Sequence, residues 1–136
     1  MKILGFNFTK ISVEKHKDSF KELKIENKVD VTNISEVKQD ILKSEEDLLA
    51  VKFKYDILYN PDVAKVEIAG TILVSVDSKL AKDTLKKWKD KETPEEFKIP
   101  LFNLIFRKAG LKALQLEEEM NLPLHMQMPA IRKKAD

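Results

Sequence analysis

The side chains in this sequence whose pattern most suggests a function form an apolar run near the C-terminus, and the function that they could serve is binding. Leu122, Leu124, Met126 and Met128 occupy alternate positions and are followed by Pro129. This spacing does not fit one side of a helix, whose period is 3.6 residues, and it predicts an extended strand that lies on other parts of the protein. Because methionine reshapes around varied partners, the segment is either ordinary packing or an adaptable binding surface.

The titratable residues show no arrangement typical of an enzyme or a metal site. The two histidines, His16 and His125, lie far apart without companions at ligand spacing, and there is no cysteine. Residues 117–119 are all glutamate, and we expect them to form a solvated helix face or to pair with lysines of a neighbouring subunit. There is no Gly-rich phosphate loop, no nucleophile beside a base and no HExxH pair. We therefore expect no catalytic residue, no metal and no cofactor.

The totals predict one domain over residues 1–136 and no nucleic-acid footprint. The chain has 25 basic and 23 acidic residues, a formal net charge of +2, and acidic residues interrupt its lysine clusters. It contains neither a secretion signal nor an apolar run of the ~20 residues that a membrane span needs. We therefore expect a cytoplasmic protein without membrane insertion.

Alternating apolar residues predict four strands that position these side chains. The first covers residues 2–14, with a β-bulge between Phe8 and Ile11, and the second includes residues 23–31 and runs toward Ile41. After a turn over residues 44–47, two strands over residues 49–59 and 66–76 flank a tight turn at residues 60–62. Gly70, inside the fourth strand, indicates a bend or the close approach of another backbone.

Two helices follow the strands. Ser78 is the expected N-cap of a helix that ends near Lys91, and Thr93 and Pro94 resemble a second helix start. We expect Pro100 to mark the start of the main helix, which runs to about residue 119. The apolar residues expected to face the sheet are Leu101, Leu104, Ile105, Leu111 and Leu114. The fold class is therefore α+β: a four-stranded antiparallel β-meander followed by two helices.

Such a sheet leaves one face without a helical cover, and neither face is fully polar in the pattern. Phe102 and Phe106 also widen the apolar stripe of the main helix, which must then be covered from two directions. Monomers rarely expose large apolar patches, so self-association is expected.

With this order of elements, the chain resembles the SecB export chaperone family. The likeness rests on the bulged, aromatic first strand and on the pair Ala69-Gly70 in the fourth. It also rests on the helix that opens near Pro100 and is followed by apolar residues at alternate positions between Pro123 and Pro129. The resemblance implies a dimer or dimer of dimers that holds non-native polypeptide without ATP in a long apolar groove. The positions that match the groove are Phe6, Phe8, Ile11, Phe102, Phe106, Leu124, Met126 and Met128.

Two departures bear on the partners. Typical export SecB is acidic and ends in a metal-binding tail that contacts SecA, whereas this chain is mildly basic and has no cysteine. This argues against delivery to SecA and is consistent with another client, such as an antitoxin. The alternatives are a small-ligand or RNA-binding oligomeric sheet protein that uses the same groove, and a purely structural oligomeric scaffold.

Overall fold

Four strands and two helices make up the computed structural model, which describes residues 1–38 and 46–134. In chain order they are β1 (Lys2–Lys15), β2 (Lys24–Val37), β3 (Glu46–Asn60), β4 (Ala64–Asp77), α1 (Ser78–Trp88) and α2 (Glu95–Glu119). The predicted class, α+β with a four-stranded antiparallel sheet followed by two helices, is confirmed. The predicted extension toward Ile41 and the turn residues Ser44 and Glu45 lie outside the described residues.

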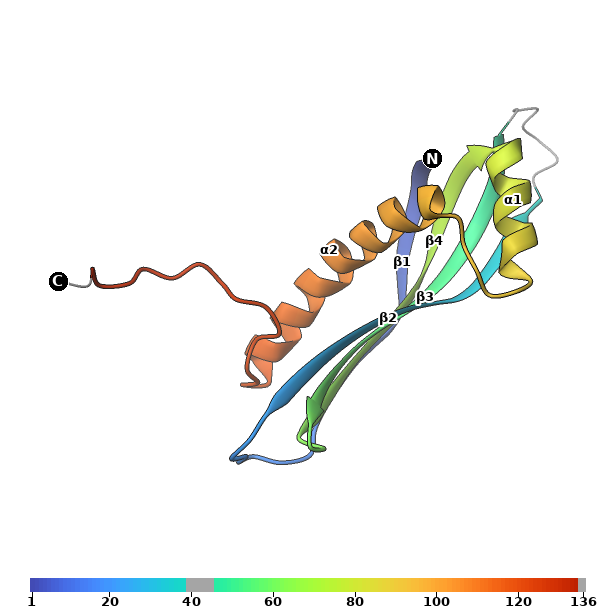
Figure 1. Ribbon diagram of the computed structural model, residues 1–136. Coiled ribbons are helices and arrows are strands. Elements are labelled where there is room, and N and C mark those ends of the chain that lie inside the picture. Colours follow the sequence, from blue (N-terminus) through green and yellow to red (C-terminus); the bar gives the residue numbers. More distant parts are fainter. Residues whose placement is uncertain (39–45, 135–136) are drawn as a thin grey trace.

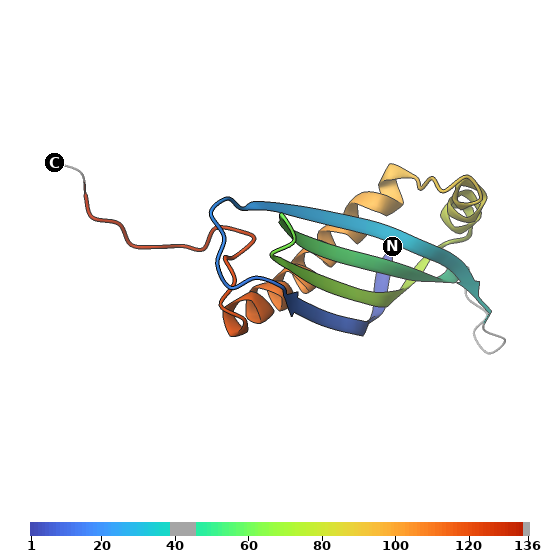
Figure 2. The same cartoon turned by 90° about the horizontal axis from the view of Figure 1, so that it is seen from below.

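The strand order is β1-β4-β3-β2, so the prediction of a simple meander was wrong for the first strand. β2, β3 and β4 do form a meander, but β1 lies beside β4, and the segment over residues 16–23 crosses to the opposite edge (Figure 2). The backbone N–H groups of His16 and Lys17 donate to the carbonyl of Val63 (2.7 and 3.2 Å), which holds the crossing segment against the β3–β4 turn. Alternation along a strand reports its two faces and carries no information about which strand lies beside it.

The inner face of the sheet is built mainly from the two central strands, β3 and β4, and the residues predicted to share one face of each strand do so. Six apolar side chains of β3 and five of β4 are almost fully buried there: Leu49, Val51, Phe53, Tyr55, Ile57, Tyr59, Val66, Ile68, Ile72, Val74 and Val76. α2 lies across this face and α1 packs near one end of the sheet (Figure 1). Burial on one face fixes the register, because a slip by one residue would turn every one of these side chains outward.

One row across the sheet combines a register shift with a closely packed glycine. Phe8 is paired with Gly70 and Gly70 with Phe53, and β1 shifts register between Phe8 and Lys10, which confirms the predicted bulge. A Cβ added at Gly70 would lie 2.4 Å from the backbone oxygen of Asn7 and 2.7 Å from the ring of Phe53. The predicted close approach at Gly70 is therefore confirmed, and only glycine fits this position without movement of its neighbours.

The helix boundaries differ from the predicted ones. Asp77 caps α1, since its carboxylate accepts from the backbone N–H of Leu80 at 2.8 Å, and Ser78 is the first helical residue. α2 begins at Glu95 and continues through Pro100, which was wrongly expected to be its start. Proline removes one backbone donor near the N-terminus, where the affected carbonyl of Glu96 lies on an exposed residue. Burial of Phe97 and Leu101, both 0% exposed, holds the helix on either side of the proline.

The outer face of the sheet carries ion pairs that keep part of it hydrated. Glu67 lies 3.1 Å from Lys10, 3.3 Å from Lys54 and 3.7 Å from Lys65. The hydrogen bond from Lys10, together with Lys54, lowers the pKa of the Glu67 carboxyl group. Surface pairs of this kind contribute little to stability. They make this part of the sheet a poor docking place for apolar segments.

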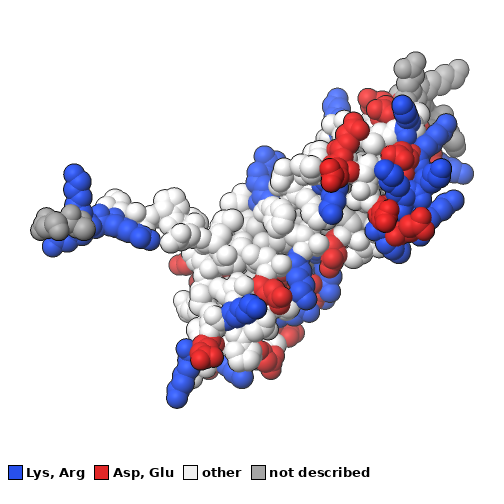
Figure 3. Space-filling view, in the orientation of Figure 1, with Lys and Arg blue, Asp and Glu red and all other residues white. Residues whose placement is uncertain are grey.

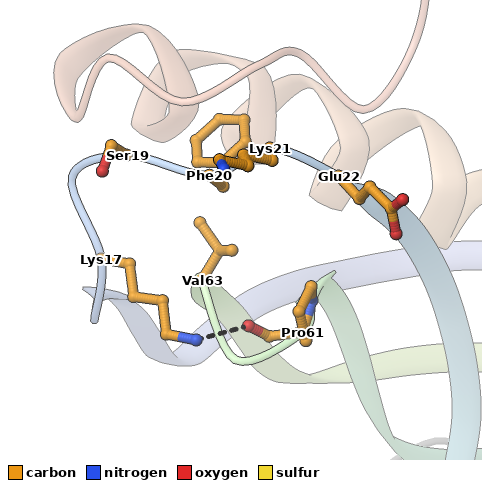
Figure 4. Close-up of a pocket in the computed structure, with 7 residues that line it drawn as sticks. All are labelled: Lys17, Ser19, Phe20, Lys21, Glu22, Pro61 and Val63. Carbon is orange, nitrogen blue, oxygen red and sulfur yellow. Dashed lines mark hydrogen bonds between the residues drawn. The ribbon is translucent and has the colours of Figure 1, made fainter.

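A hollow of about 400 Å³ lies under the crossing segment, between Phe20, Val63 and Pro61 (Figure 4). Lys17 and Lys21 also line it, and the ammonium group of Lys17 donates to the carbonyl of Pro61 at 3.3 Å. These contacts tie the segment between β1 and β2 to the β3–β4 turn.

We expect the pKa of His16, at the start of this segment, to lie above 6.5. Its ring nitrogens lie 3.3 Å from Glu14 and 3.0 Å from Asp62, and the hydrogen bond with Glu14 contributes most to the raised pKa. The contribution of protonated His16 to the stability of the fold is therefore fully present below about pH 6.5. It is lost as the pH rises through the raised pKa of the folded state. An NMR titration measures the pKa of the His16 imidazole, and Glu14→Gln should lower this pKa. A pKa at or below 6.5 in the unsubstituted chain would contradict this contact.

Candidate functional site

α2 presents an apolar ridge beside the sheet, formed by Ile99, Phe102 and Phe106. Their spacing of three and four residues places them on one side of the helix. Ile99 is 57% and Phe106 45% exposed, whereas Phe102 is half-buried. Phe106 also makes an edge-to-face contact with the ring of Tyr55 on β3, with a centroid distance of 6.1 Å. The ridge is thus anchored to the core and open to the outside.

A hollow of about 230 Å³ lies between this ridge and the edge strand β2. Val29 and Val31 of β2 line it together with Trp88 and Phe102. Two ammonium groups lie over its aromatic walls: Lys91 is 4.6 Å from the centre of the Trp88 ring, and Lys98 is 5.3 Å from that of Phe102. The hollow can take an apolar side chain, and its rim is partly cationic.

The predicted groove residues of β1 lie on the other side of α2. Phe6 packs edge-to-face on Phe8, at 5.2 Å between centroids, and its ring lies tilted against that of Phe53 at 5.3 Å. The ammonium group of Lys108 lies 5.9 Å from the Phe6 ring, which places this side of α2 over β1. Phe6 and Phe8 are therefore partly buried in the core, and α2 separates them from Phe102 and the hollow.

Ile11 and Leu111 complete the description of the β1 side. Ile11 is exposed, beyond the bulge in β1. Leu111, which was predicted to face the sheet, is 63% exposed, so that prediction was wrong. Small residues, Ala109, Gly110 and Ala113, occupy the buried side of this part of the helix instead. Large apolar side chains are thus free on both flanks of α2.

The C-terminal segment is not a strand, in contrast to the prediction. None of the described residues after Glu119 pairs with the sheet, and the chain bends at His125 and Met126. Leu122 is buried and Leu124 half-buried, but Met126 and Met128 are 48% and 52% exposed. We refer to residues 126–134 as the arm. It leaves the body of the protein in an extended course (Figure 1).

The arm is held at its base by a buried polar cluster that the sequence pattern did not indicate. Glu117 is 0% exposed, so the expected solvated face was wrong for this residue. Its carboxylate accepts from the backbone N–H of His125 at 3.0 Å and lies 2.5 Å from the His125 Nδ1 atom. The hydroxyl of Tyr59 lies 2.5 Å from Glu117 and 2.7 Å from the carbonyl oxygen of Pro123, so its single proton serves both acceptors.

This cluster also perturbs the neighbouring tyrosines. Burial, with a contribution from the charge of Glu117, raises the pKa of Tyr55 to about 12. Burial and the hydrogen bond to Glu117 raise the pKa of Tyr59 as well. Both phenols stay protonated at physiological pH. One signal could have revealed the cluster: Gly110, Ala113 and Glu117 recur at helical spacing, so Glu117 shares a face with small residues that pack closely.

One face along α2 carries few charges. In the view of Figure 3 an uncharged area extends along α2 to the start of the arm, while charged side chains gather around α1 and along the lower edge of the sheet. No group of three His, Asp or Glu side chains within residues 1–38 and 46–134 is placed to hold a metal ion. In the same part of the chain, neither helix is long and apolar enough to cross a membrane.

Comparison with solved structures identifies the fold. The SecB-like chaperone Rv1957 of Mycobacterium tuberculosis, solved in complex with a ChAD peptide from the Rv1956 HigA1 antitoxin, superposes with a TM-score of 0.53. The two chains are 10% identical over 98% of this chain and 92% of that one. At this identity the likeness shows a shared fold. No protein-family model and no curated protein matches the sequence.

Proposed function

We propose that this protein is an ATP-independent holdase that binds non-native polypeptides along α2. The observation that carries the proposal is the ridge of Ile99, Phe102 and Phe106, which is open to the outside and lies beside a hollow with apolar walls and a charged rim. Large exposed apolar patches mark interaction sites in soluble proteins. Burying each Å² of such surface contributes about 25 cal/mol. Non-native chains expose suitable apolar segments without a defined sequence.

The proposed client contacts extend from the ridge to both flanks of α2. They comprise Ile99 and the eight positions expected from the resemblance: Phe6, Phe8, Ile11, Phe102, Phe106, Leu124, Met126 and Met128. Since α2 separates the β1 residues from the hollow, we propose two apolar tracks in place of one groove. The peptide bound to the structural neighbour from Mycobacterium tuberculosis is a precedent for a polypeptide ligand on this fold.

The assembly, location and partners remain those expected from the sequence. We propose a cytoplasmic homo-oligomer, a dimer or dimer of dimers, that acts without a cofactor, without catalysis and without SecA. A small-ligand site beside the ridge is less well supported, because the hollow there, of about 230 Å³, is below the ~300–1,000 Å³ of typical ligand pockets. An oligomeric scaffold would bury the ridge between subunits, and the experiment below separates it from a holdase.

We expect the protein to suppress the light scattering of a thermally aggregating client at near-stoichiometric ratios, without ATP. Phe106→Asp should raise the concentration needed by about tenfold or more, because it removes one large apolar contact worth about 1.5–3 kcal/mol. Asn103→Asp is the matched control, since Asn103 is also exposed on α2. The native mass should not change. Unchanged suppression by Phe106→Asp would contradict the proposed site, and a fall in native mass would identify Phe106 as a subunit contact.

A further inference from the structure

The chain after α2 already runs back along the helix. It reverses at Met120 and Asn121, and the backbone N–H of Leu122 donates to the carbonyl of Glu117 at 2.9 Å. His125 is fixed by Glu117 and lies against α2, with its Nε2 atom 3.8 Å from the position of a Cβ on Gly110. Residues 122–125 are thus antiparallel to the second half of α2, as Figure 1 also shows.

The base of the arm lies next to Phe106, the last residue of the ridge along α2. The rings of Phe106 and His125 both make edge contacts with Tyr55, at centroid distances of 6.1 and 6.2 Å. Gly110 and Phe106 are four residues apart and therefore lie on adjacent turns of the same helix side. A chain that continued in the direction of residues 122–125 would pass over Phe106, Phe102 and Ile99 in that order.

We propose that the arm closes over this ridge as an intramolecular occupant, with Met126, Met128 and Ile131 on the apolar side chains of α2. This inference rests on the proposed function, because it makes the arm a competitor of the client for the ridge. Met126 and Met128 would contact a client only after the arm has been displaced. In the structure the arm is open: Met126 and Met128 are exposed and Ile131 is fully so, at 104%. Closure would bury the apolar side chains of the arm and those of the ridge against each other.

The length of the arm matches the length of the part of α2 that it would cover. From Gly110 to Glu95 the helix rises ~22 Å, at 1.5 Å per residue. From His125 to residues 132–134 an extended chain spans ~23–30 Å, at about 3.3 Å per residue. The last described residues of the arm therefore reach the beginning of α2 when Met126 lies near Phe106.

The charges at these two ends are opposite. The arm ends in Arg132, Lys133 and Lys134, and α2 begins with Glu95 and Glu96, all five of them exposed. Within the described residues neither glutamate forms an ion pair with another part of the chain. Closure would place three cations near two carboxylates at the end of an apolar contact, which fixes its direction.

A displaceable arm has a physical advantage over an open ridge. As a tethered occupant it has a high effective concentration, so it covers the ridge when no client is present and limits self-aggregation. Each of its contacts is small and replaceable by a client side chain. The polar cluster of Glu117, Tyr59 and His125 keeps its base in place when the arm is displaced.

The full-length chain can report closure directly, because it has one tryptophan and no cysteine. Ala130→Cys, labelled with bimane, places a fluorophore on the arm that tryptophan quenches only at short range, and Trp88 lines the hollow beside Phe102. We expect the emission to be at least twofold lower than that of the same label in a Trp88→Phe background. High salt and Glu95→Lys should relieve the quenching, which should not depend on protein concentration.

Three outcomes would overturn the proposal. Equal emission with and without Trp88 would show that the arm stays away from the ridge. Quenching that disappears on dilution would show docking between copies. Quenching that persists when an unfolded client is bound, as measured by scattering, would show that arm and client do not compete. A chain that shows quenching but suppresses no aggregation would retain the closed arm while the holdase function fails.

Discussion

Gly70→Ala is expected to destabilise the protein by about 3 kcal/mol or more, a large part of the 5–15 kcal/mol typical of a domain. The added Cβ would lie 2.4 Å from the backbone oxygen of Asn7, which cannot move without opening the pairing of β1 with β4. It would also lie 2.7 Å from the ring of Phe53, which is buried in the core and packs on Phe6.

Gly5→Ala is the matched control for this substitution. Gly5 lies in the same strand pair, but its added Cβ would be 3.7 Å from Leu73, an ordinary van der Waals contact. We expect a change of less than about 0.5 kcal/mol, or a slight stabilisation, since glycine is unfavourable inside strands. Urea unfolding followed by circular dichroism measures both. Equal stabilities of the two variants would contradict the role of Gly70 in the irregular row of the sheet.

Glu117→Ala should cost about 3 kcal/mol, because it leaves a backbone N–H, an imidazole and a phenol without their common acceptor. The side chains of Glu117 and His125 are 0% and 2% exposed, so water cannot readily replace the lost carboxylate. Glu118→Ala removes an equal charge from an exposed neighbour and should change the unfolding free energy by less than about 0.5 kcal/mol.

A double-mutant cycle measures the interaction between Glu117 and His125 separately from the other contacts of the two residues. If Glu117 and His125 interact as the 2.5 Å distance indicates, the combined variant Glu117→Ala with His125→Ala should be more stable than the sum of the two single losses predicts. Additive losses would show that Glu117 stabilises the end of α2 independently of His125. Thermal unfolding at constant pH provides the measurement.

The central strands could be predicted from the sequence because they carry redundant signals. In β3 and β4 the alternation of apolar residues, the turn at Pro61 and the placement of Gly70 all indicate the same register. The bulge after Phe8 was visible for the same reason: it changes the parity of an otherwise regular pattern. Local rules therefore sufficed wherever neighbours in space were also neighbours in sequence.

The predictions that were wrong concern places where residues far apart in the sequence decide the structure. The place of β1 beside β4 depends on a crossing segment held by Val63, and nothing in the alternation of β1 specifies that partner. Pro100 was expected to begin a helix, but the burial of Phe97 and Leu101 outweighs the loss of one exposed hydrogen bond. The alternation after Leu122 indicated a strand, whereas Glu117 binds His125 and thereby directs the chain along α2. In each case a tertiary contact overrides the local pattern.

Part of the site could also be predicted from the sequence. Phe102, Phe106, Met126 and Met128 could be proposed because apolar residues in excess of one buried helix face need another partner. That Phe6 and Phe8 lie across α2 from the hollow could not be predicted, since it depends on where the helix axis crosses the sheet. The hollow itself combines β2, α1 and α2 residues that are far apart in the sequence.

Site-specific cross-linking to a non-native polypeptide tests the central claim most directly. Because the chain has no cysteine, Ile99→Cys on the ridge and Lys28→Cys on the opposite sheet face can each carry one benzophenone. An unfolded client should cross-link at position 99 and not at position 28, and the same client in its native state at neither. Equal yields at the two positions, or no cross-link to an unfolded client at position 99, would contradict binding along α2.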